Sequence, residues 1–233
     1  MKRFWSRVDV IDDPRGHAIA LDGRPVRTPG RAALYLATRI LADSVAAEWR
    51  EVGDTIEPGA MPLTGLANAA LDLVEPDPAA FAAPLARYAA SDLLCYRADD
   101  PALADEQAEY WETLLDWARA RYDVHFVTAS GIMPVDQPPE TIARLSHALA
   151  ALPPFRLAAM APLVTIGGSL VAALALEAGA VSRERGWDAV TIDERWQERR
   201  WGEDAEAKAA RDARRRDWDA AATFLRLLDD DAG

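Results

Sequence analysis

The only cysteine of the chain, Cys95, lies in the stretch SDLLCYRADDP (residues 91–101), beside side chains that could each support chemistry. A cysteine nucleophile needs a nearby base, usually histidine, and surroundings that lower its thiol pKa from about 8.5. The chain has three histidines, His17, His125 and His147, and none is close to Cys95 in the sequence. The simplest interpretation is that Cys95 is a small buried apolar residue. A small hydrolase or transferase that uses Cys95 or an acidic pair is the alternative.

Acidic pairs are the other possible source of chemistry. Asp193 is followed by Glu194, and Glu203 is followed by Asp204. Neighbouring acids on a helix usually occupy a solvated face or the favourable N-terminal end of the helix dipole. The chain also has no glycine-rich phosphate loop and no paired-histidine metal motif. We therefore expect no catalytic residues, no metal site and no cofactor.

Composition excludes several classes of partner. The 233 residues are half apolar and carry a formal net charge of −12, which is typical of a soluble globular protein that nucleic acid and anionic membranes would repel. A single cysteine excludes an internal disulfide framework and fits a reducing compartment. The first residues after Met1 show no signal or transit peptide, so we expect a cytoplasmic protein.

One uncharged stretch, residues 157–176, is long enough to cross the roughly 30 Å core of a bilayer. Pro162, Gly167 and Gly168 interrupt it, and its many alanines give little transfer energy into lipid. A helix that is apolar all round is also what the centre of a multihelical core requires. We expect buried core helices here and no membrane insertion.

The periodicity of the sequence changes near Thr64. Residues 4–36 alternate apolar and polar side chains between turns, and Asp22-Gly23 is a strong hairpin signal. Thr38 is a candidate cap for a helix that follows, and the chain after Thr64 has helical spacing throughout, with a last helix from about Asp204. The pattern predicts an α+β fold, with a small antiparallel β-rich domain at residues 1–64 and a larger multihelical domain at 65–233.

Local patterns give further expectations. TIDE, residues 191–194, has the form of a capping box at a helix start, and Asp92 and Arg97 are expected to form a structural pair. Tryptophans in the most charged part of the chain suggest aromatic anchors within a polar rim, a common interface composition. The alternative is that these indoles pin the last helices to the core. They are Trp187, Trp196, Trp201 and Trp218.

Six motifs occur in one order along nearly the whole chain. They are LDGRPVRTP (21–29), EW (48–49), MPLTGLANAALD (61–72), YAASDLLCYRADDP (88–101), GSLVAALAL (168–176) and DERWQERRWGEDAEA (193–207). Together they resemble the chaperone family that assembles the F1 sector of ATP synthase in mitochondria and alpha-proteobacteria. The resemblance implies a small N-terminal β-rich domain, a C-terminal helical domain and no catalytic activity.

The same resemblance implies a partner, the alpha subunit of F1. An unassembled subunit exposes surface that drives aggregation, and a chaperone that covers this surface needs a binding face and no nucleophile. We expect a bacterial protein, because the mitochondrial leader is lacking, and a monomer. The acids of the face would meet basic residues of the client, unless they serve only as acids at a helix start. The predicted partner-binding residues are Glu194, Trp196, Trp201, Glu203, Asp204 and Glu206.

Overall fold

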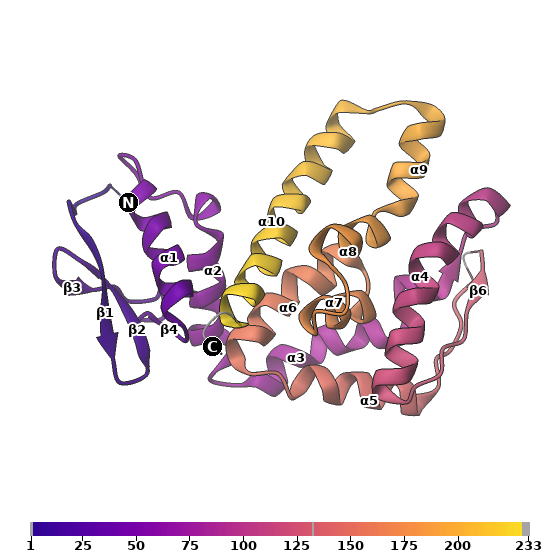
Figure 1. Ribbon diagram of the computed structural model, residues 1–233, viewed down its shortest axis with the longest axis horizontal. Helices are drawn as coiled ribbons and strands as arrows, with labels where there is room; N and C mark the ends of the chain where they lie inside the picture. Colours follow the sequence, from indigo (N-terminus) through magenta and orange to yellow (C-terminus); the bar gives the residue numbers. More distant parts are fainter. Residues whose placement is uncertain (1, 132, 230–233) are drawn as a thin grey trace. The chain divides into compact units, whose positions relative to one another are not determined.

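The structure is a computed structural model, and it describes residues 2–131 and 133–229. Its fold is α+β: an antiparallel sheet near the N-terminus is followed by helices along the rest of the chain (Figure 1). The predicted fold class is therefore confirmed.

The chain divides into two compact units that interleave along the sequence. The first unit consists of Met1–Pro78, Pro153–Ala159 and Ala220–Gly233, and the second consists of Ala79–Leu152 and Met160–Asp219. Compactness and secondary-structure content are different criteria for a domain. The predicted domains at residues 1–64 and 65–233 stay a prediction.

The sheet belongs to the first unit and is built around its second strand. The four strands are β1 (Val8–Asp13), β2 (Gly16–Leu21), β3 (Arg24–Pro25) and β4 (Tyr35–Leu36). Strand β2 pairs antiparallel with each of the other three. Asp22 and Gly23 form the turn between β2 and β3, with φ angles of 47° and 79°. Two positive φ angles suit a tight two-residue hairpin, so the hairpin predicted from this dipeptide is confirmed.

Helix α1 (Arg39–Glu51) packs on this sheet and begins at the predicted cap. The hydroxyl oxygen of Thr38 accepts a hydrogen bond from the Leu41 backbone N–H at 3.2 Å, which satisfies a donor that the helix itself leaves free. Leu41, Val45 and Trp49 recur at helical spacing and are all buried. One apolar stripe thus fastens the helix to the strands.

Helices make up most of the remaining chain. The α-helices after α1 are α2 (Pro62–Ala69), α3 (Pro78–Ala86), α4 (Pro101–Tyr122), α5 (Pro139–Ala150), α6 (Pro154–Gly167), α7 (Leu170–Glu177), α8 (Arg183–Val190), α9 (Ile192–Trp201) and α10 (Ala205–Asp229). Shorter 3-10 or π turns are η1 (Pro58–Ala60), η2 (Ala70–Val74), η3 (Arg87–Ala90) and η4 (Leu93–Cys95). Two short strands, β5 (Tyr96–Arg97) and β6 (Ala129–Ser130), pair in parallel within this region, which the sequence pattern did not predict.

The uncharged stretch at residues 157–176 is divided between α6 and α7. Gly168, with φ of +64°, follows the end of α6 in a left-handed conformation that glycine tolerates. Ser169 then caps α7 by accepting a hydrogen bond from the Ala172 backbone N–H at 2.9 Å. Residues 170–175 are all buried, so the stretch supplies core helices, as predicted. Within the described part of the chain, every helix is too short or too polar to cross a membrane.

The start of α9 differs from the prediction. Thr191 occupies the N-cap position, but its φ and ψ of −113° and 12° are not extended, and its side chain accepts no hydrogen bond from α9. Its hydroxyl donates instead to the Trp187 carbonyl oxygen at 2.7 Å. The predicted capping box is therefore wrong. Helices α8 and α9 are separated by Thr191 alone, which leaves no extended residue to turn the side chain back.

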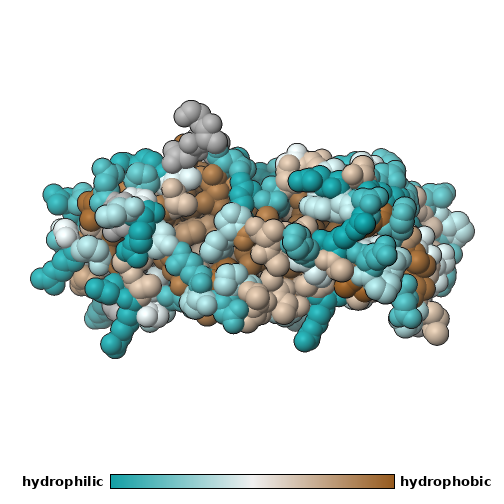
Figure 2. Space-filling model, turned by 90° about the horizontal axis from the view of Figure 1, so that it is seen from below, coloured by the Kyte–Doolittle hydropathy of each residue, from teal (hydrophilic) through white to brown (hydrophobic). Residues whose placement is uncertain are grey.

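Hydrophilic side chains predominate on the face shown in Figure 2, and hydrophobic residues form smaller areas between them. Several large apolar side chains are nevertheless well exposed, among them Trp201 at 70%. Isolated exposed apolar residues are normal on protein surfaces. Such a residue indicates an interface only where neighbouring features support it.

Candidate partner-binding site

The six residues predicted to bind a partner lie on one helical hairpin of the second unit (Figure 1). The hairpin consists of α9, a connection at residues 202–204, and the start of α10. Gly202 has φ of 93°, so the chain turns there through a conformation that favours glycine. Glu194, Trp196 and Trp201 lie on α9, Glu203 and Asp204 lie in the connection, and Glu206 lies on α10.

Ion pairs join the two helices of the hairpin. The Glu194 carboxylate accepts two hydrogen bonds from the Arg214 guanidinium, at 2.9 and 2.7 Å. The Glu198 carboxylate accepts one from Arg211 at 3.0 Å. The paired positions approach each other in sequence toward the connection, so α9 and α10 run antiparallel. A two-bond arginine–carboxylate pair fixes geometry as well as distance, and Glu194 is therefore engaged within the hairpin.

The three acids at the end of the hairpin have different surroundings. Glu203 accepts hydrogen bonds from the Lys208 ammonium at 2.9 and 2.8 Å. One Asp204 oxygen accepts a hydrogen bond from the Ala207 backbone N–H at 2.8 Å, which caps the start of α10. For Glu206 the described residues supply no ion-pair or hydrogen-bond partner. All three acids are exposed, and among them the Glu206 carboxylate is the one available to bind a partner protein.

Two indoles of α9 contact each other, one from the middle of the helix and one from its last residue. The rings of Trp196 and Trp201 meet edge to face, with centroids 5.8 Å apart and planes at 89°. The Arg200 guanidinium lies 4.9 Å from the Trp196 ring centroid, which is a cation–π distance. Tryptophan and arginine side chains are common anchors of protein interfaces.

The other two tryptophans of the charged region are structural. Trp187 and Trp218 are 5% and 0% exposed, and their ring centroids are 5.9 Å apart. The Trp218 indole N–H donates to the Arg183 carbonyl oxygen at 3.2 Å. The expectation that indoles pin the last helices to the core therefore holds for this pair, and leaves Trp196 and Trp201 as candidate anchors.

A hollow of about 360 Å³ lies between α9 and α10 near the connection. Three of the six predicted residues line it, and the other three, Trp196, Glu203 and Glu206, do not. Its walls combine an indole with both signs of charge, which suits recognition of protein side chains. The lining residues with polar or aromatic groups are Glu194, Gln197, Glu198, Trp201, Asp204, Lys208, Arg211 and Arg214.

Sequence reasoning did not single out the basic side of this hollow. A signal was present: Glu194 and Glu198 are four residues apart, and Arg211 and Arg214 are three apart, so each pair occupies one face of its helix. Two facing helices with opposite charges at such spacing favour an antiparallel pair. The signal becomes specific only once α9 and α10 are known to be neighbours.

Cys95 has none of the surroundings of a nucleophile. Its side chain is fully buried, and burial raises the thiol pKa to about 12, whereas a reactive thiol has a lowered value. Within residues 2–131 and 133–229, no group of three or more His, Cys, Asp or Glu side chains is placed to hold a metal ion. The residues around Cys95 therefore contribute to the packing of the fold and not to catalysis.

The predicted pair between Asp92 and Arg97 is wrong. Arg97 donates to the Glu112 carboxylate of α4 at 2.5 Å. Asp92 is fully buried, and its carboxylate accepts hydrogen bonds from the backbone N–H groups of Leu94 at 3.1 Å and Val171 at 3.0 Å. Asp92 thus ties η4 to the start of α7, and the backbone supplies the donors that an arginine was expected to give.

Comparison with known proteins identifies the family. The model for "ATP12 chaperone protein" matches residues 2–119, which is half of the chain. The chain belongs to the ATP12 chaperone family. The crystal structure of Atp12 from Paracoccus denitrificans matches with a TM-score of 0.91 and 41% identity, over 97% of this chain and 98% of that chain. A protein of Agrobacterium tumefaciens described as a chaperone matches with a TM-score of 0.91 and 39% identity, over 97% of this chain and 86% of its own.

The ATP12 assignment confirms the resemblance seen in the sequence motifs. It makes the chain a chaperone of ATP synthase assembly and not an enzyme, which removes the alternative of a hydrolase or transferase. The family model ends before the hairpin, but the solved structures extend the likeness over nearly the whole chain. The hairpin is therefore part of a fold shared with Atp12.

Proposed function

We propose that this protein binds the unassembled alpha subunit of ATP synthase F1 and prevents its aggregation until the subunit pairs with beta subunits. An unassembled subunit exposes apolar surface that should be buried in the complex, and such surface drives aggregation. A chaperone that binds this surface stabilises its client by mass action and needs no catalytic group. Membership of the ATP12 family supports a role in ATP synthase assembly, and the family resemblance of the sequence motifs implies the alpha subunit as client.

The observation that carries the proposal is the exposure of the hairpin tip, by which we mean residues 196–207. Every residue from 201 to 210 is exposed, including the alanines in the first turns of α10. The fold thus presents the start of a long helix without covering it. Trp201, 70% exposed, lies on this surface, as does Glu206, which has no ion-pair or hydrogen-bond partner among the described residues. We propose that the client binds here.

Charge gives the tip a means of selecting its client. The acids of the tip would meet basic residues of the alpha subunit, and complementary charge sets register and partner choice and speeds association. Ion pairs within the hairpin hold the two helices in place, so the tip is presented in an ordered form. A monomer in the bacterial cytoplasm would need one such surface, and completed F1 would offer it nothing, because beta subunits then cover the client.

The proposal is tested by retrieving the partner from a native lysate and by an aggregation assay. Tagged protein should retain free alpha subunit and should not retain intact F1. Purified protein at equimolar amounts should suppress the light scattering of isolated alpha subunit on dilution from denaturant. Failure to bind isolated alpha subunit would overturn the assignment of the client.

A further inference from the structure

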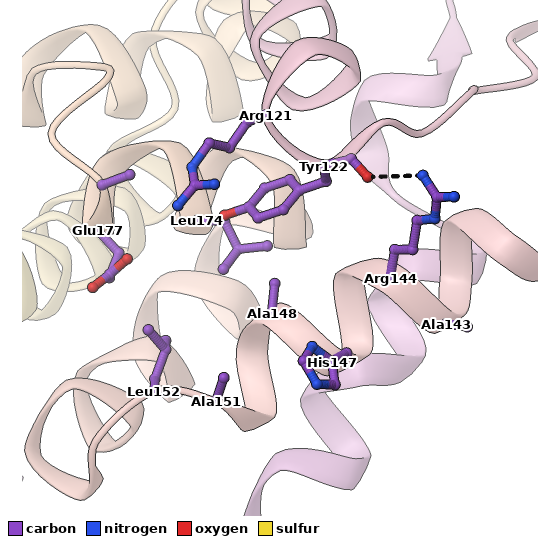
Figure 3. Close-up of a pocket in the computed structure, with 11 residues that line it drawn as sticks. Arg121, Tyr122, Ala143, Arg144, His147, Ala148, Ala151, Leu152, Leu174 and Glu177 are labelled. Atoms are coloured by element: carbon purple, nitrogen blue, oxygen red, sulfur yellow. Dashed lines mark hydrogen bonds between the residues drawn. The ribbon is translucent and has the colours of Figure 1, made fainter.

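A second surface of the helical unit lies where the end of α4 meets α5 and α7. A hollow of about 730 Å³ opens there, and in Figure 3 the ring of Tyr122 projects into the space between the end of α4 and α5. Small and apolar side chains leave the hollow open to an entering chain. These are Ala143, Ala148, Ala151, Leu152, Leu174 and Ala178.

A second hollow, of about 500 Å³, adjoins the first along α4. Tyr110, Thr113, Leu114 and Trp117 line it at the spacing of one helix face, opposite residues 180–182. Trp117 meets Tyr122 of the first hollow edge to face, with ring centroids 5.5 Å apart. The two hollows are therefore neighbours along α4, and we call them together the α4 groove.

Two arginines of the α4 groove lie on aromatic rings. The Arg121 guanidinium is 5.5 Å from the Tyr122 ring centroid, and that of Arg185 is 3.8 Å from the Tyr110 ring centroid. In the described part of the chain, neither has a carboxylate at ion-pair distance. Many other arginines of the same unit do have one, as Arg211 has with Glu198. Glu177 lines the first hollow together with Arg121, whereas the lining of the second hollow holds no acid beside Arg185. Arg185 is therefore the cation best placed to bind an outside anion, and Arg121 is the second.

We infer that the α4 groove binds a segment of the unassembled client subunit that carries an acidic side chain beside apolar or aromatic ones. This inference rests on the proposed function. The apolar side chains would fill the alanine-lined and tryptophan-lined hollows, and the carboxylate would take charge-assisted hydrogen bonds from Arg121 or Arg185. Docking of an amphipathic segment in a helix-lined groove is a recurrent mode of peptide recognition. The net charge of the chain opposes a polyanion such as nucleic acid.

Charge reversal tests the electrostatic part of the inference. Arg121→Glu combined with Arg185→Glu should weaken binding of isolated alpha subunit by about tenfold or more and reduce its salt dependence. Arg87 and Arg216 are exposed arginines of the same unit without ion-pair partners among the described residues, so Arg87→Glu combined with Arg216→Glu is a charge-matched control that should leave the affinity unchanged. Circular dichroism checks folding, and the Ala pair Arg121→Ala with Arg185→Ala replaces any variant that does not fold. An unchanged affinity in a folded double variant overturns the inference.

Cross-linking separates the α4 groove from the hairpin tip. Cys95 is buried with a raised pKa, so a benzophenone maleimide should attach only to a cysteine introduced as Ala148→Cys or Thr113→Cys in the groove, or as Ala209→Cys near the tip. The groove probes should cross-link to an alpha-subunit peptide that contains an acidic and an apolar residue. If only the tip probe cross-links, or the groove probes join two copies of this chain, the groove inference fails and the proposed function stands. If no probe cross-links to alpha subunit, the proposed function fails with it.

Discussion

The base and the tip of the α9–α10 hairpin use the same residue types for opposite purposes. At the base the Trp218 ring lies between two glycines, and a Cβ on Gly167 or Gly186 would come within 3.2 Å of it. At the tip Trp201 is 70% exposed and contacts chiefly another indole. A tryptophan therefore indicates neither a core nor an interface by itself. A core position is indicated when the neighbouring residues are small enough to make room for the indole.

Two aspartates repeat this contrast. Asp92 and Asp204 each accept backbone N–H hydrogen bonds at the start of a helix or turn. Asp92 is fully buried, and burial raises the pKa of its carboxyl from 3.8 to about 6 despite those hydrogen bonds. Asp204 is exposed. The buried cap affects the stability of the fold, and the exposed one is free to affect binding.

The largest expected effect separates the two tryptophans. Trp218→Ala should lower the free energy of unfolding by about 3–5 kcal/mol, because it empties a fully enclosed site. Trp201→Ala should change it by no more than about 0.5 kcal/mol, as is usual for surface positions. Urea unfolding of the two variants makes the comparison. Equal losses would show that the tip is packed like the base.

The buried aspartate should make stability depend on pH. A folded pKa of about 6 against 3.8 means that the folded protein holds this proton more tightly than the unfolded chain does. The resulting stabilisation is fully present below pH 4, disappears as the pH rises through 6, and amounts to about 3 kcal/mol.

Asp92→Asn provides the reference for this pH effect, because asparagine does not titrate. When the pH is lowered from 7 to 4.5, the wild-type protein should gain stability relative to the variant. The contributions of the other acids are the same in both proteins and cancel in the difference. Urea midpoints and slopes at the two pH values give the measurement. A difference that is constant with pH would mean that Asp92 is ionised throughout.

The glycines beside Trp218 offer a smaller test. Gly186→Ala in α8 should cost about 1–3 kcal/mol, since the added methyl group overpacks the indole. Gly65 lies inside α2 with nothing within 4 Å of a Cβ, so Gly65→Ala should stabilise by up to about 1 kcal/mol. Thermal unfolding of both variants is sufficient. A neutral Gly186→Ala would show that Trp218 can shift, and that its site is less tightly packed than described.

Local sequence patterns predicted the parts of the fold that depend on local interactions. The Asp22-Gly23 hairpin, the Thr38 cap and the last helix follow from residues close together in the chain. The errors at Thr191 and at Asp92 arose because a neighbouring helix or backbone segment supplied the hydrogen-bond partner. The hairpin pocket and the α4 groove could not be predicted, since each requires knowledge of which helices pack together.

The hairpin tip is best examined with a charge-matched pair of triple variants. One variant neutralises the tip, and the other removes three exposed acids elsewhere in the second unit. The tip variant is Glu203→Gln, Asp204→Asn, Glu206→Gln, in which asparagine can still cap α10. The control variant is Asp105→Asn, Glu109→Gln, Asp217→Asn.

The most direct measurement is a titration of isolated F1 alpha subunit with the wild-type protein and both triple variants at two salt concentrations, with circular dichroism as the folding check. We predict that the tip variant binds more weakly and with less salt dependence, while the control variant binds like the wild-type protein, because only the tip acids meet basic residues of the client. Equal affinity and equal salt dependence for all three proteins would contradict binding by the hairpin tip.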